Sequence, residues 1–268
     1  MKEEYSNPII LKILKFFDFI GSATIDGCNS VGNIGLFLYD SINVMLTTRP
    51  KIKKIFYQMS FIGVNSLGVI ALIGITVGAV LAVQSHIGLH RFGAERFIGP
   101  IVFISMAREF GPVLTAIMVI GRAGSAMTAE IGTMRITEQI DALQTLCINT
   151  HQYLIVPRLI ASTFILPFLS IFCSLCGITA GYLISVYVLN INPELYMESI
   201  RENVVISDIT NGLIKAIFFG FLLSLICSYK GFNTTGGAKG VGIATTQSVV
   251  YANVTIFVAD YILTSLMF

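Results

Sequence analysis

The chain has 268 residues, of which 54% are hydrophobic and 12% are charged, with a formal net charge of +2. Together with a mean hydropathy of +0.80, these values exclude an average soluble globular domain. Apolar runs of about 20 residues argue against a membrane β-barrel, whose strands are short and alternating. No dense basic run suggests nucleic-acid binding. The composition predicts a single all-α integral membrane domain over residues 1–268.

Residues 1–54 are not typical of a cleavable signal peptide, because their charge is mixed and their hydrophobicity is interrupted. Apolar side chains recur there at helical spacing in two stretches: Ile9, Ile13, Phe17 and Ile20, then Ile34, Leu38, Ile42 and Met45. This pattern predicts an amphipathic segment that lies in the membrane interface rather than crossing the bilayer. The alternative is a helix packed on the protein's own surface.

Five apolar runs follow, each long enough to cross a bilayer. They predict a transmembrane bundle over residues 58–268, with spans at Gln58–Gln84, Ile98–Ile120, Leu159–Leu189, Ile209–Tyr229 and Gln247–Phe268. The third run exceeds the hydrocarbon thickness, so this span must tilt, bend or protrude.

Lysine and arginine gather on one predicted side of the membrane. They lie before the first run, around the segment between the second and third runs, and in the last loop. By the positive-inside rule, the N-terminus and that central segment face the cytoplasm. The C-terminus then lies on the periplasmic side.

Glycines in the first run indicate close helix packing. Gly74 and Gly78 form a G-x-x-x-G, a spacing that lets two helices approach closely. The sequence leaves open whether the partner helix belongs to the same chain or to a second copy.

The second run contains two charged residues, Arg108 and Glu109, near its middle, directly before Gly111-Pro112. Proline has no N–H to donate to the carbonyl of Arg108, so a kink is expected here. Charges at this depth are costly in lipid and indicate a cavity or water. Lys215, in the fourth run, is predicted at the same level. The alternative is salt bridging that locks helices together, and the two roles can coexist.

The central segment, GRAGSAMTAEIGTMRITEQIDALQTL (residues 121–146), is polar and charged between two apolar runs. It predicts a helix over about 124–146 at the membrane face, with its glycines allowing a sharp exit from the second span. An apolar stripe of Ile136, Ile140 and Leu143 would face the bundle. A separate face would meet a soluble partner and contains Glu130, Met134, Thr137 and Asp141.

Other motifs carry little chemistry. Cys173 and Cys176 form a C-x-x-C without nearby His or carboxylate, which favours a packing role. The histidines, His86, His90 and His151, are interpreted as lacking paired ligand spacing, so no metal site is expected. The glycine-rich residues 236–242 lack the order of an ATP-binding loop and predict a turn before the last span. Any ATP-binding subunit must be a separate protein.

The stretch Gly111–Leu143 resembles the signature of the MlaE permeases (the YrbE group), the membrane subunits of ABC-type lipid transporters, and Ala244–Phe268 fits the same pattern. The resemblance implies a phospholipid permease of the inner membrane, in a bacterial or plastid envelope. It implies a homodimer around a shared cavity. It also implies a cytoplasmic ABC ATPase that holds ATP and Mg, and an MCE-domain lipid-binding protein outside.

The resemblance also implies roles for individual residues. The central segment would be the coupling helix that seats in the ATPase, with contacts from Arg122, Glu130, Gly132, Met134, Arg135, Glu138 and Asp141. The lipid cavity would place the headgroup near Arg108, Glu109 and Lys215. Related permeases can carry a basic residue at the position of Gln247. The cavity is expected to include Gln84 and Gln247, with acyl chains along Leu67, Leu72 and Leu81.

Two other classes of protein remain open. An ion-coupled secondary transporter of an amphiphile would show internal repeats with paired broken helices, and only the second run has a charged, kinked centre. A non-transporting scaffold would have no need for charges inside a span.

Overall fold

The computed structural model describes residues 21, 25, 29, 32–48 and 51–267, and these residues form helices and short connections without any strand. Within them, five helical stretches are long and apolar enough to cross a membrane: Ile52–His90, Glu95–Ile136, His151–Val188, Ile206–Phe232 and Gly237–Met267. The all-α multi-pass membrane architecture predicted from the sequence is therefore confirmed.

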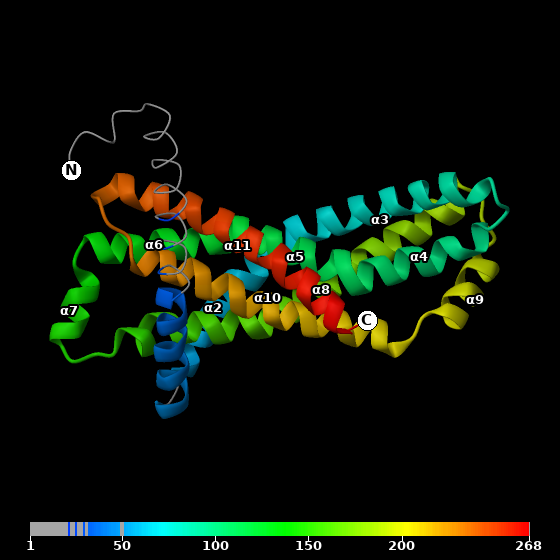
Figure 1. Cartoon of the computed structure of the whole chain (residues 1–268). Coiled ribbons are helices and arrows are strands. Elements are labelled where there is room, and N and C mark those ends of the chain that lie inside the picture. Colours follow the sequence, from blue (N-terminus) through cyan, green and yellow to red (C-terminus); the bar gives the residue numbers. More distant parts are fainter. Residues whose placement is uncertain (1–20, 22–24, 26–28, 30–31, 49–50, 268) are drawn as a thin grey trace, which may run out of the picture.

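The first three stretches are each built from several helical elements in line. In chain order, the elements are α2 (Ile52–Gly63), η1 (Val64–Ser66), α3 (Leu67–His90), η2 (Glu95–Phe97), α4 (Ile98–Ser105), η3 (Met106–Phe110), α5 (Gly111–Val119), η4 (Ile120–Gly124), α6 (Ser125–Ile136), α7 (Gln139–Thr145), η5 (His151–Ile155), α8 (Val156–Leu183), η6 (Ile184–Val188), α9 (Pro193–Asn203), α10 (Ile206–Phe232) and α11 (Gly237–Met267). Figure 1 shows them as an elongated bundle with α7 at one end and α9 with the α3–α4 connection at the other.

The second stretch does not end where hydropathy predicted. At 1.5 Å per residue, its 42 residues extend about 63 Å, roughly twice the hydrocarbon thickness. The chain makes no sharp exit at Gly121, because η4 is a π-turn that continues α5 directly into α6. Hydropathy marks only the lipid-immersed part of a helix, so it missed this polar extension.

The central segment is also not one helix from 124 to 146. α6 ends at Ile136, and Glu138 has a left-handed backbone with φ of 58° before α7 begins at Gln139. The predicted apolar stripe is only partly realised: Ile140 is buried and Leu143 packs on the same hydrophobic cluster.

A π-turn also accommodates the proline of the second stretch. η3 (Met106–Phe110) immediately precedes Gly111-Pro112, and the helix continues on both sides. Inserting an extra residue into the helical turn is a common way to tolerate a missing N–H donor. Gly111 is needed for helix contact as well, because a Cβ there would collide with Ser174 Oγ of α8.

Gly74 and Gly78 join α3 to α8 within one chain. A Cβ on Gly74 would lie 2.6 Å from the carbonyl oxygen of Cys173, and a Cβ on Gly78 would collide with the backbone of Gly177. Cys173 is buried in the main core cluster at this contact, which confirms its packing role. The question left open by the sequence is thus resolved in favour of packing inside the chain.

This contact gives a stability prediction. Gly78→Ala should lower the free energy of unfolding by about 1–3 kcal/mol, because the backbone of α8 has to shift to admit the methyl group. Gly68→Ala is the matched control in the same helix, since its Cβ would meet nothing within 4 Å. Thermal or denaturant unfolding of the detergent-solubilised protein would measure both. Equal stability of the two variants would contradict the contact.

The helix formed by residues 32–47 runs across the bundle near its α7 end (Figure 1). Phe37 is buried, with ring centroids 4.9 Å from His151 and 5.5 Å from Tyr229. One face of this helix is therefore packed on the protein itself, as in the alternative interpretation, while Ile42 and Met45 stay exposed. The first apolar stretch, from Ile9 to Ile20, lies outside the described residues.

Two connections differ from expectation. α9 was not predicted, although Asn192 and Pro193 are a typical helix start: Asn192 Oδ1 accepts a hydrogen bond from the Glu194 N–H at 2.9 Å. The glycine-rich turn is shorter than predicted, because α11 already begins at Gly237.

Candidate functional site

Three helices bring five ionisable side chains together inside the bundle. The second stretch contributes Arg108 and Glu109 from η3, α10 contributes Asp208 and Lys215, and α11 contributes Asp260. We refer to these five residues as the charge cluster. Because Lys215 pairs directly with Glu109, it lies at the level of Arg108 and Glu109, as predicted.

Lys215 is the centre of the cluster. Its side chain is 0% exposed, and its Nζ lies 2.5 Å from Glu109 Oε2 and 2.9 Å from Asp260 Oδ1. Nζ also donates a 2.7 Å hydrogen bond to the hydroxyl of Thr264. All three ammonium protons therefore have an acceptor, which is what a buried charge requires.

Arg108 occupies a different environment. Its Nε donates to Asp208 Oδ1 at 2.7 Å, and the second oxygen of this buried carboxylate accepts the Val205 N–H at 3.1 Å, at the start of α10. The Arg108 side chain is 30% exposed. Arg108 is therefore the cation of the cluster that a ligand could reach, whereas Lys215 is enclosed.

The salt bridges lock three helices together, so the alternative interpretation of these charges is realised in the structure. The cluster holds one more carboxylate than cations. An anionic headgroup would therefore not meet a pair of unsatisfied cations, and contact is restricted to the exposed part of Arg108.

An apolar pocket of about 110 Å³ adjoins the cluster. It is lined by α4, η3, α8 and α10, including Phe103, Ala107, Ser174, Ile178 and Leu213. Its volume is well below the 300 Å³ or more that is typical of small-molecule sites. The pocket beside the charge cluster therefore holds space for a section of an alkyl chain and not for a whole lipid.

Three residues expected in the cavity lie elsewhere. Gln247 is 13 residues before Asp260 on α11, about 20 Å along the helix axis, and lines a pocket with Lys230 near the turn between α10 and α11. α11 begins at Gly237, ten residues earlier than predicted. Gln247 therefore does not lie at the depth in the bundle that the sequence predicted. Leu81 packs partly on the core, Gln84 is exposed, and neither lines the pocket beside the cluster.

Two of the residues expected to contact the acyl chains, Leu67 and Leu72, also lie away from the charge cluster. Leu72 is exposed on the outside of α3. Leu67 lines an apolar pocket of about 360 Å³ with Phe56, Phe168 and Phe172, away from the charge cluster.

Several residues expected to contact an ATPase are engaged inside the chain. Arg122 donates to the Phe61 carbonyl at 2.6 Å and to Ser66 Oγ at 2.9 Å, which fixes the second stretch to the start of the first. Gly132 packs against Thr234, and Met134 joins a hydrophobic cluster.

Glu130 has a structural partner as well. Its Oε2 lies 2.7 Å from Nη2 of Arg158, whose side chain is only 3% exposed, whereas Glu130 is 53% exposed. Reversing the charge of Glu130 would leave Arg158 unpaired, so such a variant would confound folding with docking.

The remaining three residues of the expected coupling surface lie at the tip of the bundle. Arg135 and Asp141 form a 2.6 Å ion pair between α6 and α7. Glu138 is exposed in the bend between these helices. We refer to Arg135, Glu138 and Asp141 as the tip residues.

α6 is fixed to both C-terminal helices. Thr128 Oγ1 lies 2.8 Å from Ser248 Oγ of α11 and 3.0 Å from the carbonyl oxygen of Cys227 in α10. α10 and α11 thus contact α6 near one end and carry cluster residues Lys215 and Asp260 toward the other.

Sequence reasoning did not identify three of these charged residues. They are Asp208 and Asp260 of the charge cluster and Arg158, the partner of Glu130. Each is a charged residue within or at the edge of an apolar run, which is the available signal.

Comparison with known families identifies the chain. The permease MlaE family model matches residues 55–266. The chain belongs to the MlaE permease family. The resemblance of Gly111–Leu143 is therefore confirmed.

Individual relatives align with most of the chain. A probable ABC transporter permease protein of Rickettsia typhi is 40% identical over 256 residues, or 96% of this chain and 99% of that protein. The intermembrane phospholipid transport system permease protein MlaE of Haemophilus influenzae is 36% identical and covers 96% of this chain and 98% of its own length. Protein TRIGALACTOSYLDIACYLGLYCEROL 1, chloroplastic, of Arabidopsis thaliana is 41% identical over 79% of this chain and 60% of its own length.

Proposed function

We propose that this MlaE-family chain is the permease subunit of an ABC-type transporter that moves phospholipids between the inner membrane and an extracytoplasmic MCE-type lipid carrier. The observation that carries the proposal is the match of the MlaE family model to residues 55–266. In the structure, charged side chains from three helices converge on one cluster beside an apolar pocket. The relative from Haemophilus influenzae is named for intermembrane phospholipid transport. A polar headgroup at Arg108 and alkyl chains in the adjoining pocket match the two halves of such a substrate.

The tip residues are the proposed docking site for the ATPase. By the positive-inside rule, the distribution of Lys and Arg supports an α7 end in the cytoplasm and a C-terminus on the periplasmic side. Arg135, Glu138 and Asp141 lie at this end of the bundle and are at least partly exposed. ATP and Mg would be held by the partner ATPase.

α10 and α11 are the proposed mechanical link from the tip to the charge cluster. Both helices are bonded to α6 at Thr128, and both carry cluster residues about 18 Å further along. A tilt of α6 driven by the ATPase would move α10 and α11 relative to η3. The ion pairs of Arg108 and Lys215 would then be the contacts that rearrange.

A second copy of the chain would complete the lipid cavity. The pocket beside the charge cluster is about 110 Å³ in one chain, too small for a two-chain lipid. α11 also leaves a broad apolar face uncovered, including Val250, Val254, Phe257 and Tyr261. Homodimerisation would enclose such surfaces.

The docking proposal predicts a selective loss of coupling. The double variant Glu138→Lys, Asp141→Lys should abolish co-purification of the ATPase and ATP-dependent lipid transfer between liposomes, because both carboxylates are exposed at the tip. Its melting temperature should stay close to that of the unmodified protein, since surface charges contribute little to stability.

The matched control is Glu194→Lys, Glu198→Lys, which reverses two exposed carboxylates of α9 at the opposite end of the bundle. This control should keep the ATPase bound. Retention of the ATPase by the tip variant would refute the docking site, and ATP-independent lipid transfer by the permease alone would refute the proposed energy source.

An ion-coupled secondary transporter is the second candidate. Glu109, Lys215 and Asp260 form a hydrogen-bonded triad inside a membrane bundle, and such groups also serve in proton and ion relays. Lipid uptake driven by a pH gradient in liposomes that contain only this chain would favour this function.

A further inference from the structure

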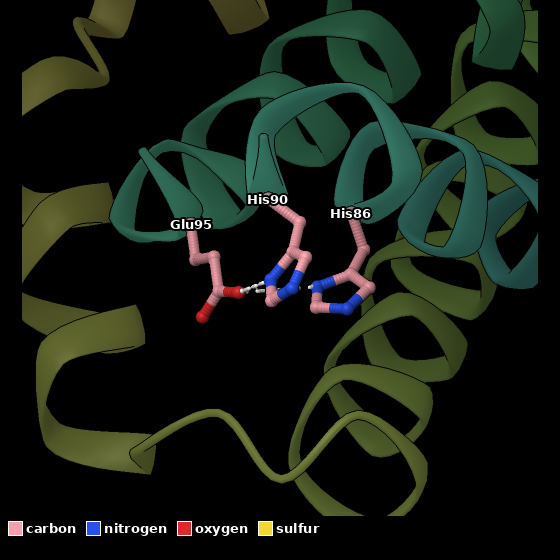
Figure 2. A group of neighbouring side chains, drawn as sticks. All are labelled: His86, His90 and Glu95. Atoms are coloured by element: carbon pink, nitrogen blue, oxygen red, sulfur yellow. Dashed lines mark hydrogen bonds and ion pairs between the residues drawn. The ribbon is translucent and has the colours of Figure 1, made fainter. Parts of the chain in front are cut away.

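Two histidines and a carboxylate gather at the end of the bundle opposite α7. His86 and His90 lie one turn apart on the last part of α3, and Glu95 begins η2 after a short turn. Figure 2 shows both imidazole rings on the same side of α3, with the Glu95 carboxylate directed toward them.

The donor atoms of these three side chains converge. His90 Nδ1 is in direct contact with Glu95 Oε1, and His86 Nδ1 lies 3.9 Å from the same oxygen. One ligand atom from each of the three residues can be chosen so that all lie within 4.8 Å of one another. The two rings are 5.2 Å apart between centroids.

His86 gives a second, independent indication. Its Nδ1 is buried but makes no hydrogen bond with any described residue. A buried polar atom without a partner requires an explanation, and a bound ion is one. This nitrogen points toward the Glu95 carboxylate, in the middle of the group (Figure 2).

The backbone between the helices holds the carboxylate in place. Gly93 adopts a left-handed φ of 62°, and the Ala94 N–H donates to the Leu89 carbonyl at 3.2 Å. This turn brings Glu95 back over His90. The interpretation that the histidines lack ligand spacing was therefore wrong: His86 and His90 are four residues apart on one helix face, the spacing found in helical zinc sites.

We propose that His86, His90 and Glu95 bind one divalent transition-metal ion, with Zn²⁺ as the best match. Two imidazole nitrogens and one carboxylate oxygen are zinc ligands, and softer or harder ions prefer other donor sets. Zn–ligand distances near 2.0–2.1 Å in a tetrahedral site put ligand atoms about 3.4 Å apart. The 3.9 Å separation of His86 Nδ1 and Glu95 Oε1 is close to this value, whereas His90 Nδ1 and Glu95 Oε1 are in direct contact and have to move apart to admit the ion.

A bound ion would tie the end of α3 to the start of the second stretch. Three protein ligands leave the fourth position of a tetrahedral ion for water. This site lies outside the charge cluster and the tip residues, and its existence does not depend on the proposed transport function.

The test is zinc binding to the full-length protein in detergent, purified without a polyhistidine tag and stripped with a chelator. Titration with ZnCl₂ followed by metal analysis should give one tightly bound ion per chain at this site. His86→Ala, His90→Ala and Glu95→Gln should each weaken this binding by about 100-fold or more, since loss of even an outer partner of a metal site weakens binding 10- to 100-fold. Co²⁺ bound in place of Zn²⁺ should show the visible absorption of a tetrahedral site.

Two control variants separate this site from other metal-binding groups. His151→Ala removes a histidine at the other end of the bundle, which contacts Ser41 Oγ at 3.1 Å, and Cys147→Ser removes an exposed free thiol. Both should keep the ion. Zn²⁺ should raise the melting temperatures of the unmodified protein and of both controls. It should leave the melting temperature of Glu95→Gln unchanged.

Either of two results would overturn the proposal. One is the absence of saturable zinc binding by the unmodified protein. The other is equal binding by the His86→Ala, His90→Ala and Glu95→Gln variants and by the two controls.

Discussion

Lys215→Met should lower the free energy of unfolding of this protein by about 3–5 kcal/mol, the usual cost of breaking a buried ion pair by removing one partner. The methionine has nearly the same length, so the loss is electrostatic. Glu109 and Asp260 both bond the Lys215 ammonium and would be left facing one another without a cation. Thermal unfolding in detergent would measure the change.

Rescue experiments distinguish this explanation from a packing defect. Adding Asp260→Asn to Lys215→Met should recover part of the stability, because it removes one of the two uncompensated carboxylates. Lys239→Met, at an exposed position in the first turns of α11, should have no measurable effect. If the double variant were no more stable than Lys215→Met, electrostatic compensation would not be the reason for the buried lysine.

Arg108 should determine how much phospholipid stays bound to the purified protein. Because Arg108→Ala alone would leave the buried Asp208 carboxylate unpaired, the informative variant is Arg108→Ala, Asp208→Asn. The amide oxygen of the introduced asparagine can still accept the Val205 N–H that Asp208 accepts at the start of α10. The double variant should retain at least about tenfold less phospholipid, since a hydrogen bond to a charged group contributes on the order of 1.5–3 kcal/mol.

Quantitative mass spectrometry of extracted lipids would give the comparison. Asp208→Asn is the matched control, and it should retain at least as much lipid as the unmodified protein, because it leaves the Arg108 guanidinium with one fewer counter-charge. If Arg108→Ala, Asp208→Asn and the control retained equal amounts of lipid, the headgroup would not be bound by Arg108. Lys215 is fully enclosed, so its effect on lipid retention should follow its effect on stability.

The local sequence identified charged residues within the bundle but not the residues that pair with them. Arg108, Glu109 and Lys215 stand out because charges in apolar runs are costly. Among their counter-ions, Asp208 lies 100 residues from Arg108 along the chain, and Asp260 lies 45 residues from Lys215. Which faces of η3, α10 and α11 meet depends on helix rotation, and composition carries no information about rotation.

Positions near the ends of the spans were predicted least well. A hydropathy window ends where polar residues begin, although the helix continues beyond the lipid. Gln247 was therefore placed too close to Lys215, and Glu130 was placed on a free surface although it pairs with Arg158. His86 and His90 show a related limit, since Glu95 joins them only because of the turn at Gly93.

The sequence by itself determined the membrane class, the five spans, the family and the presence of charges within the bilayer region. These follow from local hydrophobicity and from a contiguous motif, both of which are readable without knowing any contact. Only the tertiary structure decided that Lys215 is enclosed while Arg108 is reachable, that Gly74 and Gly78 join α3 to α8 within one chain, and that His86, His90 and Glu95 converge. Each of these depends on how helices that are distant in sequence pack together, or on the path of a turn. Both are determined by the free energy of the whole fold and not by the local sequence.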